Sequence, residues 1–164
     1  MGFSAEVVVH IVKHFFCYDF PIGPVFLAES DGAITDLVFE HIEGAVLKET
    51  PLISQAAEML REYFDGQRKV FDGLPLRVEG TEFQKKAWAA LLNIPYGQTR
   101  SYKEQAEAVG NVKACRAVGA ANGKNRISII IPCHRVVGSN KSLVGFGGGL
   151  DVKKALLELE QRYS

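Results

Sequence analysis

The 164-residue sequence lacks any uninterrupted apolar run of the roughly 18 residues that a membrane-spanning helix needs. Residues 5–18 are rich in apolar side chains, but two histidines and a lysine interrupt them and no small-residue cleavage site follows, which argues against a secretory signal. Cysteine is scarce: Cys17, Cys115 and Cys133 cannot all pair within one chain, so at least one thiol is free. Free thiols persist in reducing compartments, and we therefore expect a cytoplasmic protein without a membrane partner.

The sequence also lacks net charge, since 19 Lys and Arg residues balance 19 Asp and Glu residues, yet the two signs are unevenly distributed. Residues 1–80 carry 6 basic and 13 acidic side chains, whereas residues 81–141 carry 10 basic and 3 acidic ones. This asymmetry is typical of a chain whose middle contacts an anion such as nucleic acid. The alternative, that the two oppositely charged halves attract each other, stays open.

The beginning of the sequence predicts a short sheet. Residues 18–29 and 33–40 are rich in strand-forming side chains, and the Asp31-Gly32 pair between them is typical of a hairpin turn. The first 16 residues show no clear pattern.

A helix is predicted after these strands. Apolar residues recur at gaps of four, three and four, at Ile53, Ala57, Leu60 and Phe64, which defines one face of a helix that Gly66 ends. An extended piece, KVFDGLPLRV, follows the helix.

Helix signals crowd the second half. The stretches TEFQ at 81–84 and SYKE at 101–104 both fit the capping box, in which Ser or Thr is followed three residues later by Glu or Gln. Gly110 ends the second of these helices and Asn111 caps a third, VKACRAVGAAN, so that the two form a helix-turn-helix pattern. The apolar residues 127–131 predict a strand before the Pro-Cys-His-Arg turn.

The sequence therefore predicts a mixed α/β (α+β) fold of two domains. Residues 1–79 form a small sheet-plus-helix domain, in which residues 1–16 are an extension without a clear role. Residues 80–164 form a mostly helical domain. In this second domain a glycine-rich loop, GFGGG, leads to a last helix from Asp151.

The third predicted helix is unusually bare. Five of its residues have small side chains or none: Ala114, Ala117, Gly119, Ala120 and Ala121. Four basic residues lie on it or just after it: Lys113, Arg116, Lys124 and Arg126. Small side chains permit a close approach to a DNA groove while basic ones hold phosphates, which favours DNA binding. Tight packing of the helix inside the protein is the alternative.

The stretch SIIIPCHRVV ends an apolar run in a thiol, an imidazole and a guanidinium. Pro132 restricts its own φ and the conformation of the residue before it, so we expect Cys133 to be held at the end of a rigid strand. A nucleophilic cysteine needs a nearby base or positive charge, which His134 and Arg135 would supply. Neighbours in an extended segment point to opposite faces, so these residues need a turn or a bridging water to cooperate. The alternative is a buried, inert cysteine.

Four longer stretches carry a more specific signal: IPCHRVVGSN, GTEFQKKAWAALLNIPYGQTRSY, KACRAVGAANGKN and GFGGGLDVKKALLELE. Together they resemble the O6-alkylguanine-DNA alkyltransferases, DNA-repair proteins that take an alkyl group from damaged guanine onto their own cysteine. The resemblance covers residues 80–161 closely and residues 18–75 loosely. It implies a ribonuclease-H-like first domain and a winged-helix-like second domain.

The activity that the resemblance implies is direct repair of double-stranded DNA. The protein would flip out an O6-alkylguanine, or an O4-alkylthymine, and move its alkyl group irreversibly to sulfur. Each chain would react once, as a monomer and without a cofactor. An alkyl group on guanine O6 lies within the base stack, so the base must leave the duplex, at a cost of a few kcal/mol that protein contacts offset.

The resemblance also implies catalytic roles for individual residues. Cys133 is the implied acceptor nucleophile, His134 its base through a water, and Glu160 the carboxylate that holds the imidazole. Tyr102 is implied to help turn out the nucleotide and to protonate the guanine leaving group.

Further residues are implied to contact DNA and the extruded base. Arg116 would fill the gap left in the duplex, and Asn125 would be the hinge between the DNA-reading helix and the active-site segment. The other implied DNA contacts are Tyr102, Ala117, Gly119 and Ser139. The implied pocket residues are Val136, Phe146 and Gly147.

This sequence departs from the pattern it resembles at several positions. Arg126 stands where relatives generally have proline, which predicts a looser hinge or an added phosphate contact. Lys141 stands where glycine is frequent, so the tight turn there is in question. Cys115 takes the place of a common alanine, and we interpret it as a small packing residue. Phe146 lacks the hydroxyl of tyrosine and Gly147 offers only its backbone N–H, which predicts a roomy pocket that accepts adducts such as benzyl.

The start of the sequence contains a candidate metal site. His10, His14 and Cys17 are spaced to line one face of a helix and offer three zinc ligands. Valines dominate this stretch and no fourth ligand is evident, so we expect no metal.

Two other functions stay open. An alkyltransferase-like module would recognise the lesion without repairing it, although such relatives lack the reactive cysteine. A Cys-His hydrolase would need His134 in direct contact with the thiol of Cys133.

Overall fold

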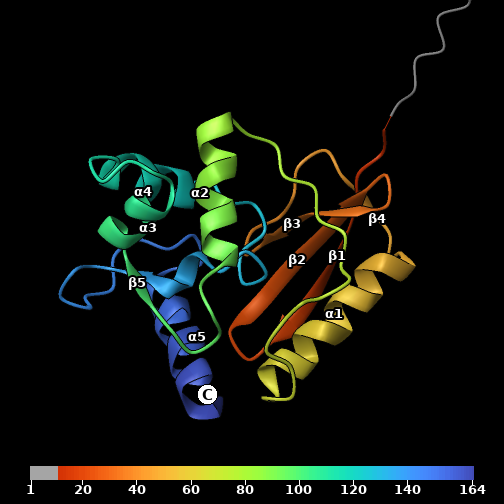
Figure 1. Cartoon of the computed structure of the whole chain (residues 1–164). Helices are drawn as coiled ribbons and strands as arrows, with labels where there is room; N and C mark the ends of the chain where they lie inside the picture. The colour runs from red at the N-terminus through yellow and green to blue at the C-terminus, as the bar shows by residue number, and fades with distance from the viewer. Residues whose placement is uncertain (1–10) are drawn as a thin grey trace, which may run out of the picture.

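The computed structural model describes residues 11–164 (Figure 1). The first half forms a four-stranded sheet of β1 (His14–Phe20), β2 (Gly23–Ser30), β3 (Ala33–Val38) and β4 (Val46–Leu47). The strand order is β3-β2-β1-β4; β1/β2 and β2/β3 are antiparallel, and β1/β4 is parallel. Helices dominate the second half, so the predicted mixed α/β fold is confirmed.

Two tight turns connect the first three strands. Asp31 and Gly32 have φ values of 51° and 77°, the left-handed pair typical of an Asp-Gly hairpin, which confirms the turn predicted there. The single strand predicted over 18–29 is wrong, because the chain reverses after β1 and divides this stretch between two strands. Pro21 and the left-handed Gly23 favour that reversal.

The start of β1 corrects two further expectations. The strand begins at His14, so the last residues of the predicted 1–16 extension belong to the sheet. His14 and Cys17 lie in a strand rather than on a helix, and three positions apart on a strand they point to opposite faces. The third proposed ligand, His10, lies outside the described residues. Within residues 11–164, no three His, Cys, Asp or Glu side chains are grouped to hold a metal ion.

Helix α1 (Pro51–Phe64) packs against the sheet and confirms the predicted helix (Figure 1). The side chain of Thr50 accepts a hydrogen bond from the Ile53 amide at 3.2 Å, and Gly66, with φ of 76°, lets the chain turn away at the other end. Ile53 and Leu60 are fully buried, as the periodicity predicted.

The second half begins with the helices α2 (Glu82–Leu92), α3 (Tyr102–Ala108) and α4 (Cys115–Gly123). Thr81 and Ser101 each head a complete capping box, as predicted. Helices α3 and α4 contact each other around a short turn and form the predicted helix-turn-helix. The predicted cap of α4 by Asn111 is wrong: this side chain accepts from the Lys113 amide at 3.0 Å within the turn, and α4 begins without a side-chain cap.

Residues 127–131, predicted to be a strand, form a compact turn instead. Ile129 has a φ of 70°, and the Ile131 amide donates to the Ile127 carbonyl at 3.0 Å. A single parallel bridge, between Leu37 and Ile127, joins the segment to β3. Left-handed geometry is costly for a branched side chain, so its surroundings must hold it. The prediction failed because an apolar run has the same pattern in a buried strand and in a buried turn.

The remaining elements are the 3-10 turn η1 (Cys133–Arg135), β6 (Val136–Val137), which pairs in parallel with β5 (Arg100–Ser101), and α5 (Leu150–Tyr163). Cys133 therefore lies at the start of a helical turn and not, as expected, at the end of a strand. This turn also replaces the extended geometry assumed for Cys133 and His134.

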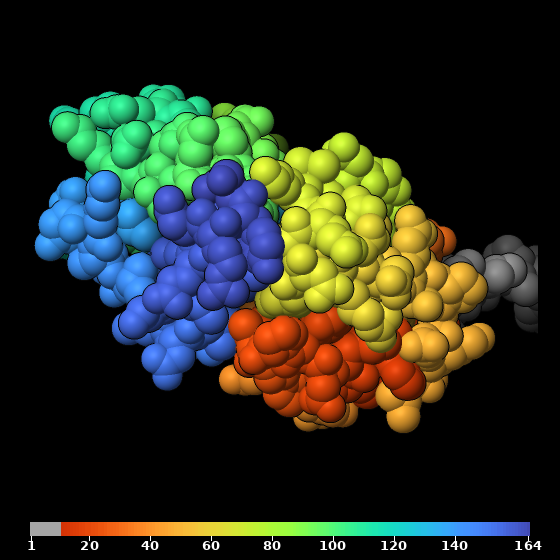
Figure 2. All heavy atoms as spheres, turned by 90° about the horizontal axis from the view of Figure 1, so that it is seen from below, coloured from red at the N-terminus to blue at the C-terminus, as the bar shows by residue number. Residues whose placement is uncertain are grey.

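One hydrophobic core joins the two halves of the described chain, and it includes buried residues of β2, β3, α1, α2, the 127–131 turn and α5. Figure 2 shows α5 in dark blue against the yellow segment that contains the end of α1 and the chain after it. Here the Tyr63 hydroxyl donates to Glu160 Oε2 at 2.6 Å. Among the described residues, none of the helices has the length and apolar character to cross a membrane.

Candidate active site

A cavity of about 540 Å³ opens beside η1, between α3, α4 and the loop before α5. Seven of the residues singled out in the sequence line it: Tyr102, Cys115, Gly119, Asn125, Cys133, Phe146 and Gly147. Cys133 is only 9% exposed, yet it faces this cavity. The arrangement therefore gives a small molecule or an extruded group access to an otherwise buried thiol.

Two aromatic side chains flank the cavity. Tyr102 begins α3, just after the capping box at Ser101, and its hydroxyl donates to the Val144 carbonyl at 3.2 Å. Burial raises the pKa of Tyr102, and negative charge on Cys133 raises it further, so the phenol stays protonated at neutral pH. Phe146 contacts Phe39 from the first half of the chain, with ring centroids 5.7 Å apart.

The thiol of Cys133 is protonated at rest. Burial raises its pKa, and this effect outweighs the polar side chains of Asn125 and Ser128 and the positive charge of Lys153, all of which lower it. Since the thiolate is the nucleophile, reaction at this sulfur requires a proton acceptor within reach.

Asn125 ties the end of α4 to the active-site turn. Its Nδ2 donates to the Ile131 carbonyl and its Oδ1 accepts from the Ile127 amide, each at 2.9 Å. Both ends of the amide are therefore used to hold the 127–131 turn, which fits the hinge position expected for this residue.

His134 follows Cys133 in sequence and is fully buried. Its Nε2 donates to Glu160 Oε2 at 2.6 Å, while Nδ1 has no hydrogen-bond partner among residues 11–164. Burial lowers the pKa of His134, although the contact with Glu160 opposes this effect. The result is a neutral imidazole with a lone pair on Nδ1, which can accept a proton.

Glu160 is the centre of the buried polar network. Besides His134, it binds Arg135 through Nε at 2.8 Å, the Tyr63 hydroxyl at 2.6 Å and the Gly97 amide at 3.2 Å. Burial alone would raise the pKa of Glu160, but His134 and Arg135 lower it to about 2. Arg135 was expected to place positive charge near the thiol, but its guanidinium pairs with the Glu160 carboxylate instead. The sequence carried no signal for Tyr63, because it lies in the other half of the chain.

Lys153 is a functional candidate that the sequence analysis missed. It is 1% exposed, and its Nζ donates to the carbonyls of Val136 at 2.7 Å and Val144 at 2.8 Å. Burial lowers the pKa of Lys153, whereas negative charge on Cys133 raises it. Lys153 thus fixes backbone beside the cavity. Its spacing of seven residues from Glu160, two turns along one helix face, was a signal that could have found it.

The residues expected to contact DNA are only partly grouped. Arg116 and Ala117 are exposed on α4. Gly119 is half-buried and lines the cavity, and a Cβ there would lie 3.7 Å from the Tyr102 ring, in ordinary van der Waals contact. Ser139 is exposed in the turn after β6. Ala114 and Ala121 of the same region are buried, so the packing interpretation of the bare helix holds for one face, while the DNA-contact interpretation of the other face stays a prediction.

Four other expectations are changed by the structure. Val136, expected in the pocket, is fully buried in the core, where β6 pairs with β5. Cys115, interpreted as a packing residue, is half-buried and lines the cavity. Arg126 donates to Asp36, with Nη2 and Oδ2 2.8 Å apart, instead of standing free for a phosphate. Lys141 takes a left-handed φ of 63° and donates to the carbonyl three residues before it, so the tight turn forms without glycine.

Comparison with known proteins links both halves of the chain to one family. Residues 13–78 match the family model described as "6-O-methylguanine DNA methyltransferase, ribonuclease-like domain", and residues 82–162 match "6-O-methylguanine DNA methyltransferase, DNA binding domain". The methylated-DNA–protein-cysteine methyltransferase of Methanosarcina barkeri is 47% identical over 149 residues, which cover 86% of this chain and 92% of the relative. The constitutive one of Bacillus subtilis is 44% identical over 151 residues, or 86% and 91%.

A solved structure extends the similarity to three dimensions. The crystal structure of Mycobacterium tuberculosis OGT in complex with DNA superposes with a TM-score of 0.86 at 44% identity, covering 92% of this chain and 94% of that one.

Proposed function

The chain belongs to the 6-O-methylguanine DNA methyltransferase family, and we propose that Cys133 is the residue that accepts the alkyl group. The protein repairs alkylated DNA by transferring the alkyl group to a cysteine of its own. One observation carries the choice of cysteine: Cys133 faces a cavity and is followed directly by a buried histidine whose Nδ1 has no hydrogen-bond partner among residues 11–164. Cys115 faces the same cavity, but it lies at the start of α4, outside the His134 and Glu160 network.

The proposed reaction is a displacement at carbon. The sulfur of Cys133 attacks the alkyl carbon, the bond from that carbon to guanine O6 breaks, and a thioether forms. The thiol proton passes through a water to Nδ1 of His134, and the guanine leaving group takes a proton from the Tyr102 hydroxyl. The histidine then returns its proton to solvent and the tyrosine recovers one, so that the net change is alkyl for hydrogen on sulfur. Because a thioether is not hydrolysed under mild conditions, each chain reacts once.

The hydrogen bond to Glu160 supports the role of His134. A carboxylate with a pKa of about 2 stays ionised, and it stabilises the imidazolium that forms when Nδ1 takes the proton. Burial keeps the imidazole neutral beforehand, which leaves Nδ1 available. His134 is therefore neutral before the reaction, and Glu160 stabilises its protonated form during transfer.

We propose that an alkylated guanine reaches Cys133 by leaving the duplex, and that O4-alkylthymine follows the same route. The 540 Å³ cavity offers the extruded base room, with Tyr102 and Phe146 beside it. The exposed face of α4 carries small side chains that permit an approach to the minor groove. Arg116 lies on that face and would occupy the space that the base leaves.

Intact mass spectrometry tests the acceptor assignment. After incubation with duplex DNA that contains one O6-methylguanine, the protein should gain one methyl group, on the peptide that holds Cys133, and the lesion should disappear from the DNA. Methylation of another residue, or loss of the lesion without a gain in mass, would refute it.

Replacing Arg116 with alanine separates base extrusion from chemistry. We expect the variant to repair duplex DNA about tenfold or more slowly, because unstacking a base costs a few kcal/mol that the side chain offsets. Its reaction with free O6-benzylguanine should be unchanged, since no base is extruded. The measurement is the single-turnover rate with each substrate; Lys113→Ala, a basic residue just before α4, is the matched control. Equal losses with both substrates would contradict the proposed role.

A Cys-His hydrolase is not favoured by this geometry. Such an enzyme needs the histidine in contact with the thiol, whereas among the described residues His134 hydrogen-bonds only to Glu160. We also propose two domains, residues 1–79 and 80–164, and a monomer that works in the cytoplasm, where its three unpaired cysteines would stay reduced.

A further inference from the structure

The active-site turn is attached to the edge of the first-half sheet. The Leu37 amide donates to the Arg126 carbonyl at 2.8 Å, and the Ser128 amide donates to the Leu37 carbonyl at 3.0 Å. These two bonds form the bridge between β3 and Ile127. The segment 125–128, of which Asn125 and Ser128 line the cavity at Cys133, is thus bound to a strand almost 90 residues earlier in the chain.

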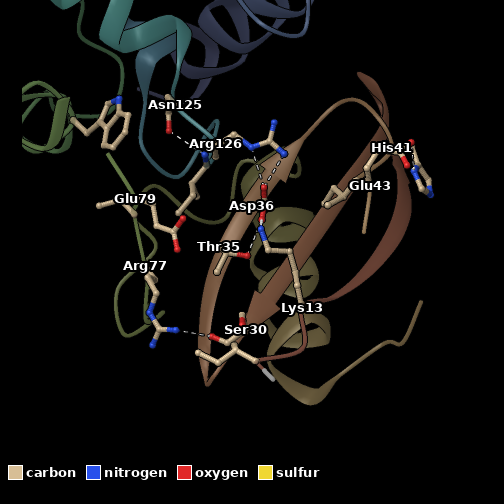
Figure 3. Close-up of a pocket in the computed structure, with 15 residues that line it drawn as sticks. Lys13, Ser30, Thr35, Asp36, His41, Glu43, Arg77, Glu79, Asn125 and Arg126 are labelled. Carbon is tan, nitrogen blue, oxygen red and sulfur yellow. Dashed lines mark hydrogen bonds and ion pairs between the residues drawn. The ribbon is translucent and has the colours of Figure 1, made fainter. Parts of the chain in front are cut away.

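A side-chain contact reinforces this bridge. The carboxylate of Asp36, 1% exposed, accepts from Arg126 Nε at 3.0 Å and Nη2 at 2.8 Å (Figure 3). It also accepts from Lys13 Nζ and Thr35 Oγ1, each at 2.7 Å. Burial would raise the pKa of Asp36, but these partners lower it, so the carboxylate is ionised at neutral pH.

Figure 3 shows where this cluster lies. It forms part of the wall of a second cavity, of about 770 Å³, between the sheet and the second half of the chain. Asn125 lines both this cavity and the one at Cys133. Arg126 therefore stands between a hinge residue that faces the thiol and a carboxylate that belongs to the sheet.

We propose that Asp36 is a positioning residue for alkyl transfer, which it serves by holding Arg126 and, with it, the segment 125–128 against β3. The proposal rests on the proposed function of Cys133. The backbone bridge alone consists of two hydrogen bonds, and the turn that follows it contains the left-handed Ile129. Charge-assisted bonds to a buried carboxylate are stronger and more directional than neutral ones, so they restrict this segment where its own geometry is unfavourable.

The proposal gives the acidic first half a part in the chemistry. Asp36 does not touch the reacting atoms, but Asn125 and Ser128 line the cavity that the Cys133 thiol faces, and both lower the pKa of that thiol. A shift of these groups by a fraction of an ångström changes the position of the sulfur and the stability of the thiolate. On this proposal, the ion pair between Asp36 in the first half and Arg126 in the second half contributes to the function of the active site.

The test compares single-turnover rates with free O6-benzylguanine, which needs no DNA contact. Asp36→Asn and Arg126→Gln should each slow transfer to Cys133 about tenfold, the scale expected when a reacting group is displaced. The double variant should be no slower than either single one, because both remove the same contact. Arg126→Lys should recover part of the rate.

Lys13→Gln is the matched control, since it removes another cation from Asp36 without touching the active-site segment. Its rate should stay within about twofold of the wild type even where its melting temperature falls, because a structural loss alone leaves the folded protein active. Equal rates for Arg126→Gln and the wild type would overturn the proposal.

A DNA-binding measurement tests the other role considered for Arg126, that of a phosphate contact. In a Cys133→Ala background, Arg126→Gln should bind duplex DNA as tightly as the parent. Weaker binding together with an unchanged rate on the free base would make Arg126 a phosphate contact and overturn the proposal. If the wild type itself gained no benzyl group, the acceptor assignment would fail and this proposal with it.

Discussion

Cys133→Ala is expected to abolish alkyl transfer completely while the affinity for alkylated DNA stays within about twofold of the wild type. The sulfur is the only atom of this side chain that can form the thioether, whereas DNA affinity comes mainly from contacts with phosphates. Mass spectrometry of the protein after exposure to O6-methylguanine DNA measures the first quantity, and a binding titration at fixed salt measures the second.

Cys115→Ala is the matched control for this experiment. Its thiol lines the same cavity and is more exposed than that of Cys133, so a merely accessible sulfur would react there first. We expect this variant to take up one alkyl group at the wild-type rate. If Cys133→Ala still took up an alkyl group, or if Cys115→Ala took up none, the cavity and not the histidine network would select the acceptor.

Glu160→Gln is expected to have the largest effect on stability. The substitution leaves Arg135 and His134 without their carboxylate inside the core, and breaking a buried ion pair costs about 3 to 5 kcal/mol of unfolding free energy. Transfer by the molecules that remain folded should slow by about a hundredfold or more, since the imidazolium loses its counter-charge. Urea unfolding and single-turnover rates measure the two effects.

The dependence on pH gives a second readout for Glu160. Its pKa is about 2 in the folded protein, below the roughly 4.3 of a free glutamate. A lowered pKa stabilises the fold above the unfolded value, and this stabilisation, about 3 kcal/mol, is lost as the pH falls from about 4.3 towards 2. The gap in unfolding free energy between wild type and Glu160→Gln should therefore close over this range.

Glu158→Gln is the control on the same helix. Its carboxylate is 64% exposed and lies 3.9 Å from Lys154, so the change in unfolding free energy should stay within about 0.5 kcal/mol. A gap between wild type and Glu160→Gln that persisted below pH 2 would mean that lost packing, rather than lost charge, destabilises the variant.

The sequence predicted those features that depend on local patterns. Capping boxes at Thr81 and Ser101, the Asp31-Gly32 hairpin and the neighbours Cys133 and His134 can all be found within a few residues. Such patterns act through hydrogen bonds and backbone preferences that the local sequence encodes.

Contacts between distant segments could not be predicted in this way. Asp36 reaches Arg126, and Tyr63 reaches Glu160, only after the chain has folded, and nothing in the neighbouring sequence distinguishes Asp36 or Tyr63 from surface residues. The strand expected at 127–131 failed for a related reason: what holds Ile129 in a left-handed conformation is the rest of the protein and not the apolar run itself.

The burial of Cys133, the proposed acceptor, affects how long a protein that reacts only once keeps its reactive thiol. Peroxides and other electrophiles attack the ionised form of an accessible sulfur, whereas the Cys133 thiol is protonated at rest and its residue is only 9% exposed. The same burial that makes a histidine base necessary therefore slows the loss of the thiol to side reactions. An unspent molecule keeps its one equivalent of reactivity until a damaged nucleobase enters the cavity.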